Sequence, residues 1–357
     1  MVTVQGIAAR VARWEHDGPQ GPVVLEMYPT LACNLDCSFC DTTERHQPPV
    51  NELSTERWLQ IIDEAAEMGV QRVFVLGGGE PLARQDAPQL LRHIKARGLE
   101  GILTTNGTLL RPSLIQQLVK TGWDEIHLSI DGPTPAIHDA LRGKRGAFKR
   151  TVRAACQTAV YKRQHQLTTP RLAIHFVLTN QNWRTLPDMV HLAAALGVFR
   201  IDFDALIAYR PEQQALQLSA AERIAVADVA REAMAIAAER GIATTLENFL
   251  HPERLSRGSS APAPASGTGL RGAPCLKAWH YLVIQADGRS SPCCVLAGEG
   301  GSARNQPLSA LWETDPFLEQ VRSGMLAKAP LPRCSECSWN ILAHEAEIRR
   351  SLPAKED

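Results

Sequence analysis

The chain has 357 residues, of which 44% are hydrophobic and 21% charged, a composition that suits one large α/β domain and a smaller one. The 38 Lys and Arg residues balance 38 Asp and Glu residues, so no net charge favours nucleic acid or a membrane surface as a partner. The first 20 residues lack the apolar core of a secretion signal and no run reaches membrane-spanning length, which predicts a cytoplasmic protein.

Strand-like and helix-like segments alternate after a short N-terminal extension over residues 1–22. Apolar strands are predicted at 23–28, 73–76, 102–104, 126–130, 172–178 and 199–206. Helices are predicted between and after them, at 54–68, 87–96, 112–120, 148–162, 186–196 and 220–240. Near-continuous apolar strands joined by helices predict a parallel sheet. Six such units predict a partial (β/α)6 barrel of the TIM type, open on one side, over residues 23–255.

The composition changes at residue 256, where Ser, Ala, Pro and Gly predict a flexible linker over residues 256–273. A small Cys-rich domain is expected over 274–345, followed by a tail over 346–357. Within this domain we expect a strand at 281–285, a turn at 286–288, one helix at 308–322 and a final helix.

Nine cysteines in a chain without a secretion signal favour metal binding or redox chemistry over disulfides. Cys156 stands alone on a predicted helix and is expected to be a buried apolar filler. The other cysteines form groups at 33–40, 275–294 and 334–337. Cys33, Cys37 and Cys40 lie in one loop after the first strand, so their thiolates could bind three irons of a [4Fe–4S] cluster and leave the fourth open. A zinc site is the alternative, with His46 as the nearby fourth ligand.

Further polar motifs follow the other strands, at the edge of a parallel sheet where ligands bind. They are Gly77-Gly-Gly-Glu80-Pro81 after the second strand, Thr104-Thr-Asn106-Gly107 after the third and Ser129-Ile-Asp131-Gly132 after the fourth. The last of these could also be a simple turn. His127 and His175 lie on strands and could point into the barrel, although structural histidines are commoner.

The Cys-x3-Cys-x2-Cys loop, with Phe39 before its last cysteine, and the Gly-Gly-Glu-Pro motif resemble those of the radical S-adenosylmethionine (SAM) superfamily over residues 23–250. The resemblance implies a [4Fe–4S] cluster on Cys33, Cys37 and Cys40, with SAM bound to the open iron. It also implies SAM contacts from Phe39 (adenine), from Gly78, Gly79 and Glu80 (ammonium group), from Ser129 and Asp131 (ribose) and from Arg142 (carboxylate). Asn106 and Asn180 are further expected cofactor contacts. Arg142 could instead belong to a solvated basic face. No catalytic acid or base is identified.

Cys275, Gly288-x4-Cys293 and Cys334-x2-Cys337 resemble the SPASM and twitch extensions of radical SAM enzymes. The resemblance implies one auxiliary [4Fe–4S] cluster on Cys275, Cys293, Cys334 and Cys337, the twitch arrangement, because a full SPASM domain continues with three more cysteines. A structural zinc is the alternative. Cys294 could replace Cys293, act in redox chemistry or be buried. It occupies the place of an Asp in sulfatase-maturing relatives, which counts against that activity.

The resemblance implies reductive cleavage of SAM to a 5′-deoxyadenosyl radical, with electrons from a flavodoxin or ferredoxin-type reductant, and hydrogen abstraction from a substrate C–H. Only 32 residues precede Cys33, which is short for the peptide-recognition domain of many peptide maturases. We therefore expect oxidation or rearrangement of a small sugar-like or aminocyclitol-like intermediate, with the auxiliary cluster as electron acceptor. Peptide maturation of the SPASM type is the alternative. An iron–sulfur redox or scaffold protein is the non-enzyme alternative, which Gly78-Gly-Glu-Pro disfavours.

Overall fold

The computed structural model describes residues 2–40, 51–208, 210–255 and 267–353, so His46 and most of the predicted linker lie outside the described residues. Nine strands form one sheet in the order β7-β6-β5-β4-β3-β2-β1-β8-β9. Strands β1 to β8 pair in parallel with their neighbours, and only β9 is antiparallel. The strands are β1 (Val24–Met27), β2 (Arg72–Val75), β3 (Glu100–Thr105), β4 (Glu125–Ser129), β5 (Arg171–Leu178), β6 (Arg200–Ala205), β7 (Ala243–Thr244), β8 (Tyr281–Ile284) and β9 (Ser290–Ser291).

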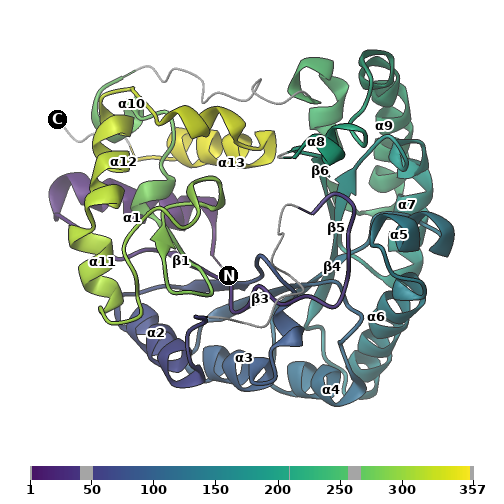
Figure 1. Cartoon of the computed structure of the whole chain (residues 1–357), viewed down its shortest axis with the longest axis horizontal. Coiled ribbons are helices and arrows are strands. Elements are labelled where there is room, and N and C mark those ends of the chain that lie inside the picture. Colours follow the sequence, from purple (N-terminus) through teal and green to yellow (C-terminus); the bar gives the residue numbers. More distant parts are fainter. Residues whose placement is uncertain (1, 41–50, 209, 256–266, 354–357) are drawn as a thin grey trace.

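The predicted partial barrel is confirmed, because β1 to β6 follow one another in sequence order across the sheet. Crossover helices pack on the outer side of the curved sheet (Figure 1). They are α2 (Thr55–Glu67), α3 (Ala87–Ala96), α4 (Pro112–Lys120), α6 (Ala147–Gln164), α7 (Leu186–Leu196) and α9 (Ala220–Arg240). Local signals set their ends: the Ser54 hydroxyl accepts from the Arg57 N–H at 3.2 Å, and Gly241 ends α9 in the left-handed conformation. None of the helices in the described ranges combines the length and apolarity that crossing a bilayer requires.

Helix α1 (Val4–His16) forms within the segment that was expected to be only an extension. Its buried face, Ile7, Ala8 and Val11, is short and packs against the C-terminal part of the chain. Helix α5 (Pro135–Leu141) and strand β7 were also not predicted. These elements are short and depend on tertiary contacts, so their own pattern is weak.

The single helix expected at 308–322 is two helices, α11 (Leu308–Thr314) and α12 (Pro316–Leu326). Pro316 has no N–H to continue the hydrogen-bond ladder, which separates the two. The Asp315 carboxylate accepts from the N–H groups of Phe317 and Leu318, both at 3.0 Å, and thereby caps α12. Helices α8 (Pro211–Gln214), α10 (Gly269–Gly272) and α13 (Trp339–Arg350) complete the set of α-helices in the described ranges.

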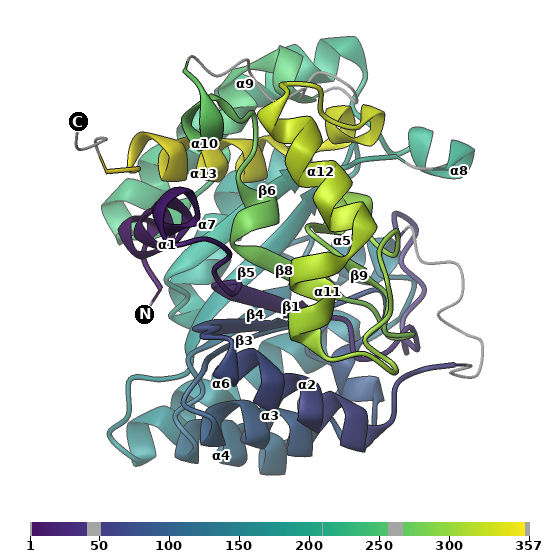
Figure 2. The ribbon, with the colours of Figure 1, turned by 90° about the vertical axis from the view of Figure 1, so that its left-hand side faces the viewer.

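The Cys-rich segment continues the barrel sheet. Strand β8 pairs with β1 from Val24↔Tyr281 to Met27↔Ile284, so β1 has a parallel neighbour on each side. Helices α1, α10, α11 and α12 lie on this side of the molecule (Figures 1 and 2). The pairing brings the cysteines of the C-terminal segment to the open side of the barrel.

A buried cation joins the two ends of the chain. The Arg322 guanidinium of α12 lies 4.8 Å from the ring centre of Trp14 in α1 and 4.6 Å from that of Trp312 in α11. Its Nε donates to the Ala278 carbonyl at 3.0 Å and its Nη1 to the Trp312 carbonyl at 2.8 Å. Burial lowers the pKa of Arg322 to about 10, so it is charged at neutral pH.

We expect Arg322→Ala to lower the free energy of unfolding by about 3 kcal/mol, because it removes two buried charge-assisted hydrogen bonds and two ring contacts. Urea denaturation measures the change. Arg231→Ala, at an arginine whose side chain is 60% exposed, is the matched control and should change stability by less than about 0.5 kcal/mol. Equal effects of the two substitutions would contradict the assigned role of Arg322.

Candidate functional site

A cavity of about 380 Å³ opens at the carboxyl ends of the barrel strands. Its lining includes all residues predicted to contact the first cluster or SAM, except Asp131 and Asn180. These lining residues are Cys33, Cys37, Phe39, Cys40, Gly78, Gly79, Glu80, Asn106, Ser129 and Arg142. Motifs that follow four different strands therefore meet in one place, as the parallel sheet requires.

The glycine motif supports the cysteine loop directly. The Gly79 N–H donates to the Thr30 carbonyl at 3.1 Å, and the Glu80 N–H donates to the Ala32 carbonyl at 2.8 Å. A Cβ atom at Gly79 would lie 2.2 Å from the Ala32 carbonyl oxygen, so only glycine permits this approach. The motif thus has a structural role in addition to any contact with a ligand.

Glu80 is a buried carboxylate that joins the ends of β2 and β3. Its Oε1 accepts from the Thr105 hydroxyl at 2.7 Å and the Leu82 N–H at 3.0 Å, and its Oε2 accepts from the Asn106 N–H at 2.7 Å. Burial raises the pKa of Glu80 in spite of these hydrogen bonds. A cation in the cavity would favour the ionised form, so the residue fits the predicted role beside an ammonium group.

Arg142 is buried at the end of α5, which excludes the solvated basic face considered from sequence. Its Nε donates to the Asp131 carboxylate, its Nη1 lies 3.8 Å from the Cys37 sulfur, and its guanidinium lies 5.2 Å from the Phe39 ring centre. Burial opposes its charge, but Asp131 and then Cys37 outweigh that effect and raise the pKa of Arg142. Arg142 therefore places a fixed positive charge beside the thiol of Cys37.

Asp131 does not face the cavity as predicted. It is fully buried, and its second carboxylate oxygen accepts from the Val177 N–H at 2.9 Å, so Asp131 orients Arg142 and does not reach a ribose. Asn180 also lies away from the lining, where its side-chain amide donates to the Ala215 carbonyl at 2.8 Å. Both predictions came from the family resemblance together with position after a strand, and position after a strand does not fix where a side chain points.

Helix α5 packs against the backbone of the cysteine loop. The N–H groups of Asp36 and Ser38 donate to the carbonyls of Arg142 (3.3 Å) and Leu141 (3.0 Å). Gly143 ends the helix with φ of +64°, and a Cβ atom there would lie 2.0 Å from the Asp36 carbonyl oxygen. From the other side, the Gln213 amide donates to the carbonyls of Phe39 (3.1 Å) and Cys40 (2.9 Å).

His175 of β5 also lines this cavity, although no function was predicted for it. Its Nε2 lies 2.9 Å from Oδ2 of Asp204 on β6. Burial opposes protonation, but the hydrogen bond and charge of Asp204 outweigh it and raise the pKa of His175. A histidine in the carboxyl-terminal half of a strand, with an Asp on the next strand, was the available signal.

Four cysteines surround a second cavity, walled by apolar residues such as Leu296 and Val321. They are the four predicted to hold an auxiliary cluster, Cys275, Cys293, Cys334 and Cys337. Burial raises the pKa of the Cys334 thiol to about 11 and that of Cys337 to about 12. Buried thiols of this kind ionise readily only beside a cation, so the donor set suits an iron–sulfur cluster. The described residues contain no three His, Cys, Asp or Glu side chains arranged for a single metal ion.

The remaining two cysteines lie outside the linings of both cavities. Cys294 is near Glu26 and Lys277, and burial, followed by the charge of Glu26, raises its pKa to about 12. Cys156 is exposed, so the prediction of a buried filler is wrong. The two alanines before it suggested burial, but its side of α6 faces outward.

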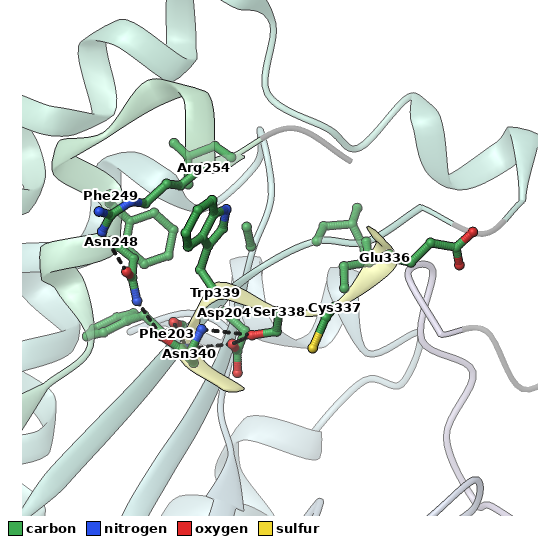
Figure 3. A pocket seen from close by; sticks show the side chains of 14 residues that line it. Phe203, Asp204, Asn248, Phe249, Arg254, Glu336, Cys337, Ser338, Trp339 and Asn340 are labelled. Atoms are coloured by element: carbon green, nitrogen blue, oxygen red, sulfur yellow. Dashed lines mark hydrogen bonds between the residues drawn. The ribbon is translucent and has the colours of Figure 1, made fainter. Parts of the chain in front are cut away.

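A third pocket shares lining residues with each of the other two. Residues 205–207 line both it and the first cavity. Cys337, which is labelled among the residues of the third pocket in Figure 3, also lines the second cavity. The carboxyl end of β6 is therefore a shared wall between the first cavity and the third pocket, and Cys337 lies between the third pocket and the four-cysteine cavity.

Comparisons with known proteins identify two matching families. Residues 27–193 match the radical SAM superfamily, and residues 275–338 match the SPASM iron–sulfur cluster-binding domain. An AdoMet-dependent heme synthase of Methanosarcina barkeri is 26% identical over 87% of this chain and 86% of its own length. A PqqA peptide cyclase of Granulibacter bethesdensis is 27% identical over 87% of this chain and 79% of its own length. The mycofactocin maturase MftC of Mycolicibacterium smegmatis is 32% identical over 55% of this chain and 48% of its own length.

A solved structure supports the fold assignment. Streptococcus suis SuiB bound to its precursor peptide SuiA superimposes with a TM-score of 0.67 over 88% of this chain and 70% of that chain, at 20% identity. This similarity concerns the fold alone.

We expect Gly143→Ala to lower the iron content after anaerobic reconstitution with iron and sulfide, because the added Cβ would push the cysteine loop away from α5. Gly122→Ala is the matched control: Gly122 also has a positive φ (+66°), but no atom lies within 4 Å of the position that its Cβ would take. Full iron loading of Gly143→Ala would contradict the tight packing described above.

The buried His138 makes stability depend on pH. Its Nδ1 accepts from the Asp131 N–H at 3.2 Å, and burial, followed by the charge of Arg142, lowers its pKa to about 4. In the unfolded chain the histidine binds a proton near its ordinary pKa. The contribution of neutral His138 to the free energy of unfolding is therefore intact above that pKa and declines as pH falls toward 4. In the wild type, His138 should lower the free energy of unfolding by about 2 kcal/mol between neutral pH and about pH 5. We expect this decrease to be absent in His138→Asn, which retains a hydrogen-bond acceptor. Urea denaturation at both pH values tests this, with the exposed His165→Asn as control.

Proposed function

Because this chain belongs to the radical SAM superfamily and carries a C-terminal SPASM iron–sulfur domain, we propose that it oxidatively modifies a carbon centre of a peptide. The observation that carries the proposal is the meeting of the three-cysteine loop and the glycine motif in one cavity, with a third pocket that shares lining residues with this cavity and with the four-cysteine cavity. Such an enzyme binds a [4Fe–4S] cluster, SAM and an auxiliary iron–sulfur cluster.

In this proposal Cys33, Cys37 and Cys40 hold the SAM cluster, and Cys275, Cys293, Cys334 and Cys337 hold the auxiliary cluster. When bound, the first cluster and SAM supply a 5′-deoxyadenosyl radical that takes a hydrogen atom from the substrate. A flavodoxin or ferredoxin-type protein supplies the electron.

The chain's own residues orient the cofactors in the cavity. Glu80 receives the ammonium group of SAM, and Gly78 and Gly79 allow close approach of the ligand. Phe39 contacts the adenine, and Ser129 and Asn106 supply polar groups near the sugar. Arg142, fixed by Asp131, places its positive charge between Cys37 and the ring of Phe39, where it stabilises anionic groups.

A peptide fits better than the sugar-like or aminocyclitol-like substrate expected from sequence. PqqA peptide cyclases and a mycofactocin maturase are among the relatives, and SuiB was solved with a precursor peptide. The cavity and the third pocket lie next to each other and share residues 205–207 as lining. A tetrapyrrole side chain is the second candidate, because the M. barkeri heme synthase matches over 86% of its length.

The substrate class is tested under anaerobic conditions with SAM, dithionite and two probes. One probe is a pool of synthetic peptides from short reading frames beside the gene, and the other is Fe-coproporphyrin III, named in a relative 28% identical over 338 residues. We expect 5′-deoxyadenosine together with a peptide that has lost about two hydrogens. Conversion of the porphyrin alone would replace the peptide by the second candidate, and conversion of neither would reject both.

The ligand assignment predicts that a triple Cys33/Cys37/Cys40→Ala variant forms no 5′-deoxyadenosine but keeps about four irons per chain in the auxiliary cavity. Iron analysis and electron paramagnetic resonance measure the remaining cluster. Cys156→Ala, at an exposed thiol, is the control and should lose neither cluster nor activity. Zinc, or no metal, in the triple variant would refute the auxiliary cluster ligands.

A further inference from the structure

His175 is accessible from the cavity and fixed in position. It is paired in register with Ser129 of β4 and Asp202 of β6, so it lies at the level of the predicted SAM contacts. Its side chain is 36% exposed, which distinguishes it from the neighbouring His127 at 8%. A ligand in the cavity can therefore reach the His175 ring.

Asp204 determines which nitrogen of His175 is available. Its Oδ2 accepts from Nε2 at 2.9 Å, so the neutral ring carries its hydrogen on Nε2 and has a lone pair on Nδ1. A carboxylate that orients a histidine in this way makes the opposite nitrogen a proton acceptor. The hydrogen bond to His175 also lowers the pKa of Asp204 in spite of burial, which keeps Asp204 charged.

The same carboxylate contacts the C-terminal domain. Oδ1 of Asp204 accepts from the Asn340 amide at 2.6 Å and from the Ser338 hydroxyl at 3.2 Å. Ser338 follows Cys337 directly and caps α13 (Figure 3). Asp204 therefore bridges a histidine in the barrel cavity and the side chains of two residues that closely follow a cysteine of the second cavity.

We propose that His175 accepts the proton that the substrate loses when its electron passes to the auxiliary cluster, and that Asp204 couples the two transfers. This inference rests on the proposed function. One hydrogen atom leaves the substrate carbon and forms a C–H bond of 5′-deoxyadenosine. The remaining substrate radical loses one electron to the oxidised auxiliary cluster. It also loses one proton to Nδ1 of His175, from a neighbouring X–H group of the substrate, where X is the atom that will bond to the radical carbon. A C–X bond then forms, and a one-electron carrier of the ferredoxin or flavodoxin class reoxidises the auxiliary cluster.

Coupling of this kind has a thermodynamic consequence that needs no substrate. If reduction of the auxiliary cluster favours protonation of His175, protonation must favour reduction by the same factor. The midpoint potential of that cluster should then become more negative as pH rises through the pKa of His175. The charged groups that face or surround His175 are Asp202 and Asp204 of β6, Asp131 beyond β4, and Glu80 and Arg142 across the cavity.

The test uses reconstituted holoenzyme and redox titrations of the auxiliary cluster followed by electron paramagnetic resonance from about pH 6 to about pH 9. The variant is His175→Gln, which can still donate to Asp204 but cannot take up a proton. The matched control is His127→Gln, because His127 is also a strand histidine bonded to a carboxylate (Glu125, 2.9 Å) but lies outside the cavity lining.

We expect wild type and His127→Gln to show the pH-dependent potential and His175→Gln to show a nearly constant one. With a peptide that the wild type converts, His175→Gln should still form 5′-deoxyadenosine but should form about 100-fold less of the modified peptide. The same pH dependence in His175→Gln, or none in wild type, would overturn the inference. Absence of 5′-deoxyadenosine from fully loaded wild type would instead reject the proposed function, and the potentials are measured independently of it.

Discussion

The parallel pairing of β1 with both β2 and β8 is the constraint on which the rest of the structure depends. Strand β1 leads into the loop of Cys33, Cys37 and Cys40, and β2 leads into the glycine motif, so their pairing puts these two segments in contact. On its other side β8 leads, through a turn and β9, to Cys293 and Cys294. One short, fully buried strand thus links the three-cysteine loop to the segment that carries Cys293.

Buried charges around the first cavity are arranged in pairs or hydrogen-bonded groups. An isolated ion in this environment would be strongly destabilising, and removal of one partner leaves the other without compensation. Asp131 satisfies Arg142, and Thr105, Leu82 and Asn106 satisfy Glu80. These contacts hold the side chains in place before any ligand binds, and such preorganisation avoids the cost of ordering them during the reaction.

Local signals were sufficient to predict the six strand–helix units. Apolar runs located the strands, and the helix ends that form at Ser54, Pro112 and Gly241 depend on the conformation and hydrogen bonding of a few neighbouring residues. Cysteine spacing similarly identified two groups of thiols that the fold brings to two cavities. The direction of Asp131 and the pairing of His175 with Asp204 could not be predicted, because they depend on contacts across strands that are far apart in sequence. Helix α1 was missed for the same reason, since its small apolar face is stabilised by the C-terminal part of the chain.

Besides its cysteines, the C-terminal domain contributes hydrogen bonds to residues of the barrel and of the N-terminal segment. Ser338 and Asn340 donate hydrogen bonds to Asp204 on β6. The N-terminal segment is also bound to this domain, because the Trp14 indole donates to the Trp279 carbonyl and the Trp312 indole donates to the Gln20 carbonyl. A displacement of this domain would therefore alter the hydrogen bonds of Asp204 as well as the distance between the two cysteine sets. Because the group that orients His175 is hydrogen-bonded to the side chain of Ser338, the residue after Cys337, the geometry for proton transfer and the geometry for electron transfer are set by the same contacts. In the proposed reaction this matters most after hydrogen abstraction, when the substrate radical must lose an electron and a proton before it takes back a hydrogen atom.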